Sequence, residues 1–568
     1  MGIINICHDT VYRTPEYTND TIPPNITLNE CQKKVASDII NEIKNPEGKR
    51  THLIFGVTGS GKTQVYMECI DSVIESGKQV ILLIPEISLT YQNLNRFYQR
   101  YGDRVSVMNS RLSQGERYDR FEMAKDGKID IMIGPRSALF TPFSNLGLII
   151  IDEEHENAYK AENTPKYHAR ETAVMRAGLT DATVILGSAT PSVEAFYKAQ
   201  NGEYMLHKMM KRVNDMPLPK VHVVDLREEL KAGNKSVFSV RMAELIADRL
   251  KKKEQTILFV NRRGYAGFVS CRSCGKTLKC PHCDVSLTYH KEHEEIMECH
   301  YCGYSIKKPD TCPFCGSKYL GKFGIGTQSV QEKIKKLFPE ARVLRMDMDT
   351  TKGKEGHQKI LSAFSKGEAD ILVGTQMIVK GHDIQGVTLV GVIAADLSLY
   401  ASDYRAAEKT FELLTQAAGR AGRGHKTGEV VIQTYNPEEY SIMAAAKQDY
   451  EEFYRQELIY RKMMKYPPAY NMAAILFSSK NEELCKKCAE DVAGRINNSK
   501  LDNMTVIGAT RASISKINDI YRYVIYIKHQ QYDMLIHVKD GVEKYIDMVH
   551  TYKTSVNIQF DFTPMDYY

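Results

Sequence analysis

The chain contains no tryptophan, so tyrosine and phenylalanine must supply any aromatic stacking surface. It has no apolar run close to the roughly 20 residues that a membrane-spanning helix requires. Residues 1–25 are polar and lack the apolar core of a secretory signal peptide. The net charge is only +6, which excludes a uniformly basic surface. These absences predict a cytoplasmic protein without a membrane partner, in which any charged binding surface is local.

The chain does have length, and it concentrates its cysteines in one place. Its 568 residues are 43% hydrophobic and 26% charged, which is enough for three or four globular domains. Eight of the 13 cysteines lie between Cys271 and Cys315, as four consecutive C-x-x-C pairs. In a reducing compartment paired cysteines favour metal binding over disulfides. The cluster therefore indicates a metal module.

A tetrahedral zinc ion needs two C-x-x-C pairs, so four pairs predict two structural zinc sites. The pairs can combine in three ways, and the first two are separated by only five residues, 275–279. A hairpin is easier across the 15 residues between the second and third pairs. We therefore favour a nested arrangement, in which an outer site holds the first and last pairs and an inner site the other two. In chain order the pairs are Cys271/Cys274, Cys280/Cys283, Cys299/Cys302 and Cys312/Cys315.

Other possible ligands are less favoured, because eight thiolates already suffice for two ions. Cys485 and Cys488 form a fifth C-x-x-C, but no further pair remains to complete a site. Their neighbours follow helical spacing, which predicts two half-buried thiols on a helix face. Four histidines near the cluster are possible ligands in principle: His282, His290, His293 and His300.

Residues 51–63, THLIFGVTGSGKT, predict a strand, a glycine-rich loop and a helix, which is the context that a phosphate-binding loop requires. Gly59 and Gly61 allow backbone N–H groups to surround phosphates. Lys62 would neutralise the β and γ phosphates of ATP, and Thr63 would offer its hydroxyl to Mg²⁺. The predicted nucleotide-binding residues are Gly56, Val57, Thr58, Gly59, Ser60, Gly61, Lys62 and Thr63.

An acidic cluster, DEEH at 152–155, follows the apolar run LIII at 148–151, which is typical of a buried parallel strand. Asp152 is expected to hold Mg²⁺ and Glu153 to polarise the attacking water. Further strand-like runs that end in turn residues lie at 82–86, 131–136, 184–191, 371–376 and 389–393. This rhythm predicts two parallel sheets covered by helices, with function at the carboxyl ends of the strands.

Two arginines, Arg420 and Arg423, lie three residues apart in QAAGRAGR at 416–423. At this spacing they share one helical or turn face, and the small residues between them permit close approach to a phosphate. Offered across a cleft by a second lobe, they would act as arginine fingers.

In order along the chain, GVTGSGKT, DEEH, GSATPS, GTQMIVKGHD and QAAGRAGR resemble the motifs of superfamily 2 helicases. The eight-cysteine insertion, residues 396–423 and MKYPPAY at 464–470 extend the match. From about Gln32 to the C-terminus the chain resembles the PriA family of bacterial replication-restart helicases. The resemblance also implies the nested cysteine pairing, and it places Gln32 on the adenine base.

The resemblance implies an ATP-driven DNA helicase that translocates 3′ to 5′ and acts in replication restart. It implies ATP, Mg²⁺ and two Zn²⁺ as cofactors. The implied partners are forked and single-stranded DNA, primosome proteins and single-stranded-DNA-binding protein. An alternative enzyme is a superfamily 2 motor that moves on duplex DNA without separating the strands. A third alternative, a zinc-stabilised scaffold without turnover, is disfavoured by the intact candidate catalytic residues Lys62, Asp152, Glu153, Arg420 and Arg423.

Possible DNA contacts lie on loops that follow strands. Arg136 in GPRSALF and Thr375 in VGTQ occupy such positions. The segment from Tyr159 to Arg170 mixes aromatic and basic side chains, which suit stacking on bases and pairing with phosphates. The resemblance implies that this loop couples DNA binding to ATP hydrolysis. The alternative is an exposed loop with packed tyrosines.

The expected fold class is α/β, with two RecA-like lobes, a two-zinc insertion in the second lobe and a C-terminal α+β domain. We expect the lobes at 28–222 and 223–445, the insertion at 270–318 and the last domain at 446–568. Residues 1–27 resemble a linker or the remnant of a winged-helix region. The DNA-binding domains that the family carries ahead of the motor do not fit before Gly56, so we expect an N-terminally short form, and favour truncation. Recognition of a leading-strand 3′ end is the property that this expectation puts in doubt.

Overall fold

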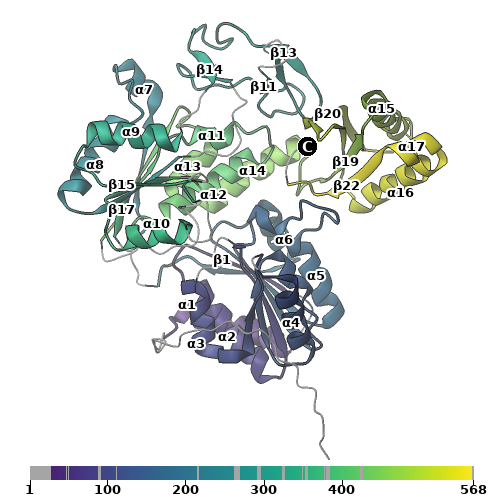
Figure 1. Ribbon diagram of the computed structural model, residues 1–568, viewed down its shortest axis with the longest axis horizontal. Helices are drawn as coiled ribbons and strands as arrows, with labels where there is room; N and C mark the ends of the chain where they lie inside the picture. The colour runs from purple at the N-terminus through teal and green to yellow at the C-terminus, as the bar shows by residue number, and fades with distance from the viewer. Residues whose placement is uncertain are drawn as a thin grey trace, which may run out of the picture. The chain divides into compact units, whose positions relative to one another are not determined.

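Figure 1 shows a computed structural model of the chain, whose contacts divide it into two compact units, Met1–Asp215 and Met216–Tyr568. Within the described residues, no helix combines the length and the apolar character needed to cross a bilayer. The structure describes residues 27–45, 48, 50–86, 91–110, 112–213, 217–260, 269–290, 296–322, 326–347, 350–351, 356–375, 378, 384, 386–422, 426–499, 501–565 and 568.

The first unit is built on a parallel sheet. Its inner strands are buried along almost their whole length, because helices cover both faces of a parallel sheet. Within the described residues seven strands form this sheet. In spatial order they are β3 (Val105–Val107), β4 (Ile131–Gly134), β2 (Gln79–Leu83), β5 (Leu146–Asp152), β6 (Thr183–Ser188), β1 (Thr51–Gly56) and β7 (Met205–Met209).

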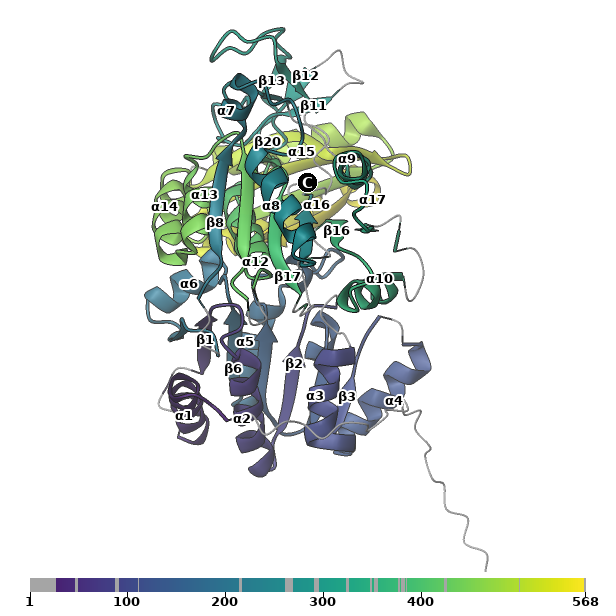
Figure 2. The ribbon, with the colours of Figure 1, turned by 90° about the vertical axis from the view of Figure 1, so that its left-hand side faces the viewer.

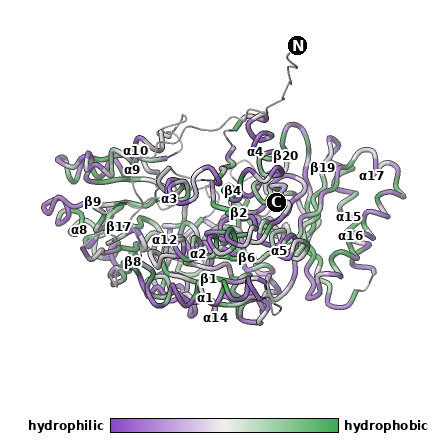
Figure 3. The backbone as a smooth tube through the Cα atoms, turned by 90° about the horizontal axis from the view of Figure 1, so that it is seen from below, coloured by the Kyte–Doolittle hydropathy of each residue, from purple (hydrophilic) through white to green (hydrophobic). Residues whose placement is uncertain are grey.

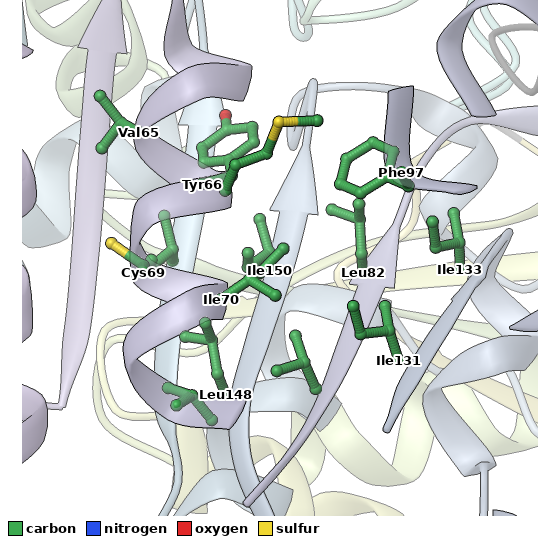
Figure 4. Packing of buried hydrophobic residues seen from close by; sticks show 14 of the residues in the cluster. Val65, Tyr66, Cys69, Ile70, Leu82, Phe97, Ile131, Ile133, Leu148 and Ile150 are labelled. Carbon is green, nitrogen blue, oxygen red and sulfur yellow. The ribbon is translucent and has the colours of Figure 1, made fainter. Parts of the chain in front are cut away.

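Helices and short 3-10 turns connect these strands. Figure 4 shows Tyr66 and Ile70 of helix α2 on the side that faces Ile150 of the sheet, and all three belong to one buried hydrophobic cluster. The α-helices are α1 (Glu30–Lys44), α2 (Lys62–Glu75), α3 (Tyr91–Tyr101), α4 (Gln114–Lys125), α5 (Ala169–Thr180) and α6 (Val193–Gln200). The 3-10 turns are η2 (Gly102–Arg104), η3 (Arg136–Phe140) and η4 (Asn157–Tyr159).

The second unit contains another parallel sheet, which has six strands in the described part of the chain. The strand at 220–225 pairs with the strand at 429–434, so it belongs to this sheet although the expected lobe boundary at 222 would divide it. In spatial order the strands are β15 (Val343–Met346), β16 (Ile371–Gly374), β9 (Gln255–Phe259), β17 (Val387–Val392), β18 (Glu429–Thr434) and β8 (Lys220–Asp225).

Figures 1 and 2 show helices on both faces of this second sheet, with α8 and α9 on one side and α12 on the other. Arg461 of α14 is fully buried, and its guanidinium pairs with Glu457 at 2.7 Å and with Glu408 of α12 at 2.6 Å. The helices are α7 (Leu226–Lys231), α8 (Val240–Lys251), α9 (Thr327–Leu337), α10 (Gly356–Ser365), α11 (Asp396–Leu399), α12 (Ala406–Ala418), α13 (Tyr440–Lys447) and α14 (Tyr450–Met463).

The cysteine-rich insertion leaves the second sheet after β9 and carries short antiparallel strands. They are β10 (Val269–Cys271) paired with β14 (Leu320–Lys322), and β11 (Thr288–His290), β12 (Ile296–Glu298) and β13 (Ser305–Lys307) in one small sheet.

The chain ends in an antiparallel sheet covered by helices. The strands, in spatial order, are β20 (Thr505–Ile517), β21 (Ile520–His529), β19 (Asn471–Ser479) and β22 (Asn557–Phe562). The helices are α15 (Glu482–Asn498), α16 (Tyr532–Met548) and α17 (His550–Ser555). Cys485 and Cys488 lie on the buried face of α15, more deeply than expected, since neither thiol side chain is exposed.

Figure 3 shows hydrophobic stretches along inner strands such as β2 and β6. The expected fold class is confirmed: two α/β units with parallel sheets, a cysteine-rich insertion in the second and a C-terminal α+β domain.

Candidate nucleotide and metal sites

The predicted phosphate-binding loop lies between β1 and α2, at the carboxyl edge of the first sheet. Helix α2 begins at Lys62, so its unpaired N–H groups and dipole favour an anion at the loop. The Lys62 ammonium donates to the carbonyl of Gly56 at 2.9 Å, which folds the side chain back over the loop. Gly61 has φ 82°, a left-handed conformation that other residues rarely adopt.

Gln32 of α1 lies directly against this loop and is only 2% exposed. Its side-chain amide donates to the carbonyl of Ser60 at 3.0 Å and accepts from the N–H of Asn29 at 2.8 Å. A Cβ atom on Gly61 would lie 2.1 Å from the Gln32 amide nitrogen, so only glycine allows this approach. Gln32 therefore braces the loop, and its contact with adenine stays a prediction.

The acidic cluster begins at the carboxyl end of β5, where Asp152 is the last residue of the strand. The Tyr66 hydroxyl donates to the Asp152 carboxylate at 3.0 Å, and the Tyr159 hydroxyl donates to its backbone carbonyl at 2.7 Å. Burial raises the pKa of Asp152 to about 6; the Glu153 carboxylate adds to the rise and the Lys62 ammonium opposes it. The structure thus brings the predicted phosphate-binding lysine and the predicted Mg²⁺ ligand into electrostatic contact.

The residues after Asp152 turn sharply. Glu153 has φ 50°, which is uncommon outside glycine and marks a constrained turn. Nδ1 of His155 lies 2.7 Å from the hydroxyl of Ser188 at the end of β6, and 3.7 Å from the Glu153 carboxylate. Ser188 belongs to the GSATPS motif, so the DEEH and GSATPS segments are physically linked.

The sequence did not single out Glu154, yet its side chain joins the DEEH and GSATPS segments. Its carboxylate is buried, pairs with Arg170 at 2.8 Å and accepts from the N–H of Ser192 at 2.7 Å. Arg170, expected on a DNA-facing loop, is only 4% exposed. A buried pair between the two motifs and α5 serves to hold them in one geometry.

The two ends of the segment from Tyr159 to Arg170 are buried, whereas residues 162–165 between them are exposed. Tyr159 and Lys160 are buried, whereas Tyr167 remains partly exposed. Arg136 donates to the carbonyl oxygens of Ala158 and Lys160, and its guanidinium lies 5.6 Å from the centre of the Tyr167 ring. Tyr159 packs as the alternative interpretation expected, and Arg136 ties the loop to η3.

In the second unit the predicted arginine finger Arg420 and the predicted DNA contact Thr375 lie at opposite edges of one sheet. Arg420 follows α12, and the adjoining Gly422 N–H donates to the carbonyl of Val387 at the start of β17. Thr375 follows the carboxyl end of β16. Arg423 and most of GTQMIVKGHD lie outside the described residues, so their placement stays a prediction.

The cysteines form two groups of four in the described part of the chain, and within each group the sulfur atoms lie within 4.8 Å of one another. The nested pairing is the one that the structure shows: Cys271 lies 3.6 Å from Cys315, Cys274 lies 3.7 Å from Cys312, and Cys280 lies 3.5 Å from Cys302. Tetrahedral zinc with Zn–S bonds of about 2.3 Å places its sulfur ligands about 3.8 Å apart. Both groups therefore fit Zn²⁺.

The four histidines have no place in these two groups. His282 is exposed and packs edge-on against Tyr304, and His300 is buried near the inner group without contributing a ligand atom to either set. His293 and the side chain of His290 lie outside the described residues.

The inner zinc group shares a hydrophobic core with the C-terminal domain. The Tyr466 hydroxyl donates to the carbonyl of Cys283 at 3.2 Å, and the rings of Tyr301 and Tyr526 lie 4.9 Å apart. The outer group is more open, since Cys315 is exposed. The insertion is thus fixed to the last domain through its inner half.

A nucleotide-binding α/β unit with P-loop and DEEH segments, followed by a second α/β unit with an arginine-bearing segment, defines the superfamily 2 helicase class. Family models match accordingly. "Type III restriction enzyme, res subunit" matches residues 25–193, and "Helicase conserved C-terminal domain" matches 316–425. "PriA DNA helicase Cys-rich region (CRR) domain" matches 280–307, and "Primosomal protein N C-terminal domain" matches 462–565. The chain belongs to the PriA family.

Three of the relatives that carry the name replication restart protein PriA show the extent of the match. The protein of Bacillus subtilis is 46% identical over 93% of this chain and 66% of its own length. The Synechocystis protein is 44% identical over 86% of this chain and 60% of its length, and that of Chlamydia pneumoniae is 40% identical over 93% and 71%. This chain therefore spans less than two thirds of the first two relatives.

Among solved structures, RecG bound to a three-way DNA junction aligns with 76% of this chain and 47% of its own, at 16% identity and a TM-score of 0.45. A likeness at that level carries no inference.

Proposed function

We propose that this chain is an ATP-dependent 3′–5′ DNA helicase of the PriA type that acts in replication restart. The observation that carries the proposal is the combination, in one chain, of the P-loop and DEEH site with a two-zinc insertion and a C-terminal domain that match PriA-specific family models. The polarity and the use of stalled forks rest on the family alone.

The proposed chemistry assigns one task to each candidate residue. Lys62 and the backbone of the loop hold the β and γ phosphates, and Gln32 contacts adenine. Thr63 and Asp152 hold Mg²⁺, and Glu153 orients the attacking water. Arg420 and Arg423 stabilise the charge that develops on the transferred phosphate. ATP bound with Mg²⁺ would supply the γ-phosphoryl group, whose transfer to water with release of ADP would drive the motor.

The proposed partners are forked and single-stranded DNA, together with primosome proteins and single-stranded-DNA-binding protein. The two Zn²⁺ ions would staple an insertion too small to have a sufficient core of its own. The insertion and the C-terminal domain share one hydrophobic core, so they form a joint surface. We assign the docking of protein partners to this surface. The cytoplasmic location stays a prediction, and fractionation of cells that express the chain tests it.

Replacing Lys62 by alanine should lower the ATPase turnover number by about 10²–10³, because the phosphates lose their positioned cation. DNA binding should stay within about twofold of the unchanged protein, since Lys62 serves the nucleotide. ATP hydrolysis with and without single-stranded DNA, and binding by fluorescence anisotropy, measure the two effects. Undiminished hydrolysis in Lys62→Ala would refute the assignment of this loop.

Strand separation distinguishes the proposal from the alternative, a motor that moves on duplex DNA. A forked substrate with a labelled strand, incubated with ATP, reports displacement while phosphate release reports turnover. Displacement together with turnover supports a helicase, and turnover alone favours the translocase. Forks with and without a leading-strand 3′ end show whether the chain selects that end.

A further inference from the structure

A cavity of about 390 Å³ lies in the second unit, on a face to which the proposed function assigns no residue. That volume is within the usual range for small-molecule sites, roughly 300–1,000 Å³. Leu226, Ile393 and Tyr435 form part of its lining, and each is the first residue after a strand (β8, β17 and β18). The cavity therefore opens at the carboxyl edge of the parallel sheet, where ligands bind in this class of fold.

Three cations from separate parts of the chain line the cavity. Lys235 comes from the loop between α7 and α8, Arg272 from the first zinc-binding C-x-x-C, and Lys333 from α9. All three side chains are exposed. In the described part of the chain neither Lys235 nor Lys333 forms an ion pair. The convergence of three positive charges favours an anionic ligand.

The carboxylate in this lining is already engaged. Glu229 accepts from the Asn234 side chain at 2.6 Å and from the backbone N–H of Val240 at 3.1 Å. Glu229 thereby links the loop that carries Lys235 with the start of α8. Its carboxylate accepts both of these hydrogen bonds. The net charge offered to a ligand is thus positive.

Two tyrosine rings complete the lining. Tyr319, next to β14, is 68% exposed, which is unusual for a large aromatic side chain without a partner surface. Tyr435 is half-buried; burial raises the pKa of its hydroxyl and the nearby Arg272 guanidinium opposes the rise, so the hydroxyl stays a neutral donor. The cysteine-rich insertion places a cation beside an aromatic ring at another position as well. There the Lys276 ammonium lies 5.0 Å from the centre of the exposed Phe314 ring.

We propose that this cavity binds a nucleotide of single-stranded DNA, with the phosphate between Lys235, Arg272 and Lys333 and the base against Tyr319. Exposed aromatic rings interleaved with cations are the means by which proteins hold single strands. An acidic peptide would satisfy the cations but leave the ring without a planar partner. The inference rests on the proposed function, because it assumes that the motor engages single-stranded DNA.

Four variants of the full chain test the site. Lys235→Ala combined with Lys333→Ala removes two charges, Tyr319→Ala removes the ring, and Tyr319→Phe keeps it. Lys336→Ala is the matched control, because Lys336 is an exposed lysine of α9 outside the cavity lining. Thermal unfolding and zinc content establish that each variant is folded. The probes are a labelled oligodeoxythymidylate and an abasic oligonucleotide of equal length.

The double lysine variant should weaken binding to both probes and reduce the slope of log K against log salt by up to about 0.7, since one phosphate contact contributes about 0.7 on single strands. Tyr319→Ala should weaken binding to the oligodeoxythymidylate by about 5- to 100-fold and leave binding to the abasic probe unchanged. Tyr319→Phe and Lys336→Ala should bind both probes as the unchanged protein does.

Each outcome supports or overturns the site. Unchanged affinity and salt slope in the double lysine and Tyr319→Ala variants, with normal binding by the unchanged protein, would sink this inference alone. If the unchanged protein failed to bind single-stranded DNA, the proposed function itself would fail. A glutamate-rich peptide that competed fully with DNA, combined with an indifferent Tyr319→Ala, would identify an acidic peptide as the occupant instead.

Discussion

At the scale of single residues, the candidate nucleotide site depends on contacts too short to tolerate an added atom. Tyr66 is fully buried beneath Asp152, and a Cβ atom on Gly187 would lie 1.6 Å from its hydroxyl oxygen. Burial and the adjacent Asp152 carboxylate raise the pKa of Tyr66. The hydroxyl therefore stays protonated and donates a hydrogen bond to Asp152. Gly187 is the β6 residue that makes room for this donor.

Changing Gly187 to alanine should therefore destabilise the first unit by about 1–3 kcal/mol through overpacking and lower ATPase activity by displacing Tyr66 from Asp152. Urea unfolding and steady-state hydrolysis measure the two effects. Gly178→Ala on α5 is the control, because nothing lies within 4 Å of its added Cβ, and it should be neutral or stabilising. Equal behaviour of the two alanine variants would contradict the role assigned to Gly187.

At the scale of secondary-structure elements, neighbouring strands bring together residues that are far apart in the chain. His52 of β1 and His207 of β7 stack with ring centres 5.3 Å apart, and Nδ1 of the first lies 3.1 Å from Nε2 of the second. Burial, helped by His207, lowers the pKa of His52 from 6.5 to about 3. The folded first unit therefore keeps His52 neutral where the unfolded chain binds a proton.

The sign of the pH effect follows directly. The unfolded chain protonates His52 at its ordinary pKa of 6.5 and the folded chain only near 3, so the free energy of unfolding falls as the pH drops between these values. The loss should approach about 1.4 kcal/mol per pH unit. Urea unfolding across this range should show a shallower pH dependence in His52→Leu than in the unchanged protein. Parallel curves would rule out this histidine as the source.

The two zinc groups differ in their contacts with the C-terminal domain and in their exposure. Cysteines of both groups belong to the core that carries Tyr466 and Tyr526, but Tyr466 hydrogen-bonds directly to Cys283 of the inner group, whereas Cys315 of the outer group is exposed. Cys283→Ser should therefore accelerate amide exchange in β19 and β21 by about tenfold or more, and Cys315→Ser should leave these strands protected. Hydrogen exchange with zinc quantification measures this. Equal protection of both strands in the two variants would show that the shared core does not depend on the inner zinc.

At the scale of the whole molecule, the second unit separates its candidate functions across one sheet. The Arg420 segment lies at the amino edge of β17, and Thr375 and the cavity lie at the carboxyl edge. The P-loop belongs to the first unit and Arg420 to the second. If Arg420 acts as proposed, hydrolysis depends on both units although each has its own sheet and core.

Arg420→Ala should accordingly lower ATP turnover by about 10³ or more while nucleotide affinity changes little, because an arginine finger acts on the transition state. Arg241→Ala, which removes a partly exposed arginine from α8, should leave turnover unchanged. Single-turnover hydrolysis and binding of a fluorescent nucleotide separate the two quantities. A loss of affinity with unchanged turnover would assign Arg420 to ground-state binding.

The sequence by itself determined the parts whose chemistry is local. A P-loop, an acidic strand end and repeated C-x-x-C pairs each place their functional groups within a few residues, so their spacing alone predicts their function. The sequence also favoured the nested zinc pairing, because the five residues 275–279 disfavour joining the first two pairs and a hairpin is easier across the next 15, and the structure confirms it. The periodicity of buried strands similarly predicted two parallel sheets.

Only the tertiary structure decided the contacts between distant segments. It buried Arg170 on Glu154, although the pattern around it predicted a DNA-facing loop. It set Tyr66 on Asp152, 86 residues away, and paired His52 with His207 across 155 residues. It also gathered the cavity lining from two helices, a loop, a zinc-binding pair and three strand ends. Burial and charge at such places depend on packing between elements, which no local spacing encodes.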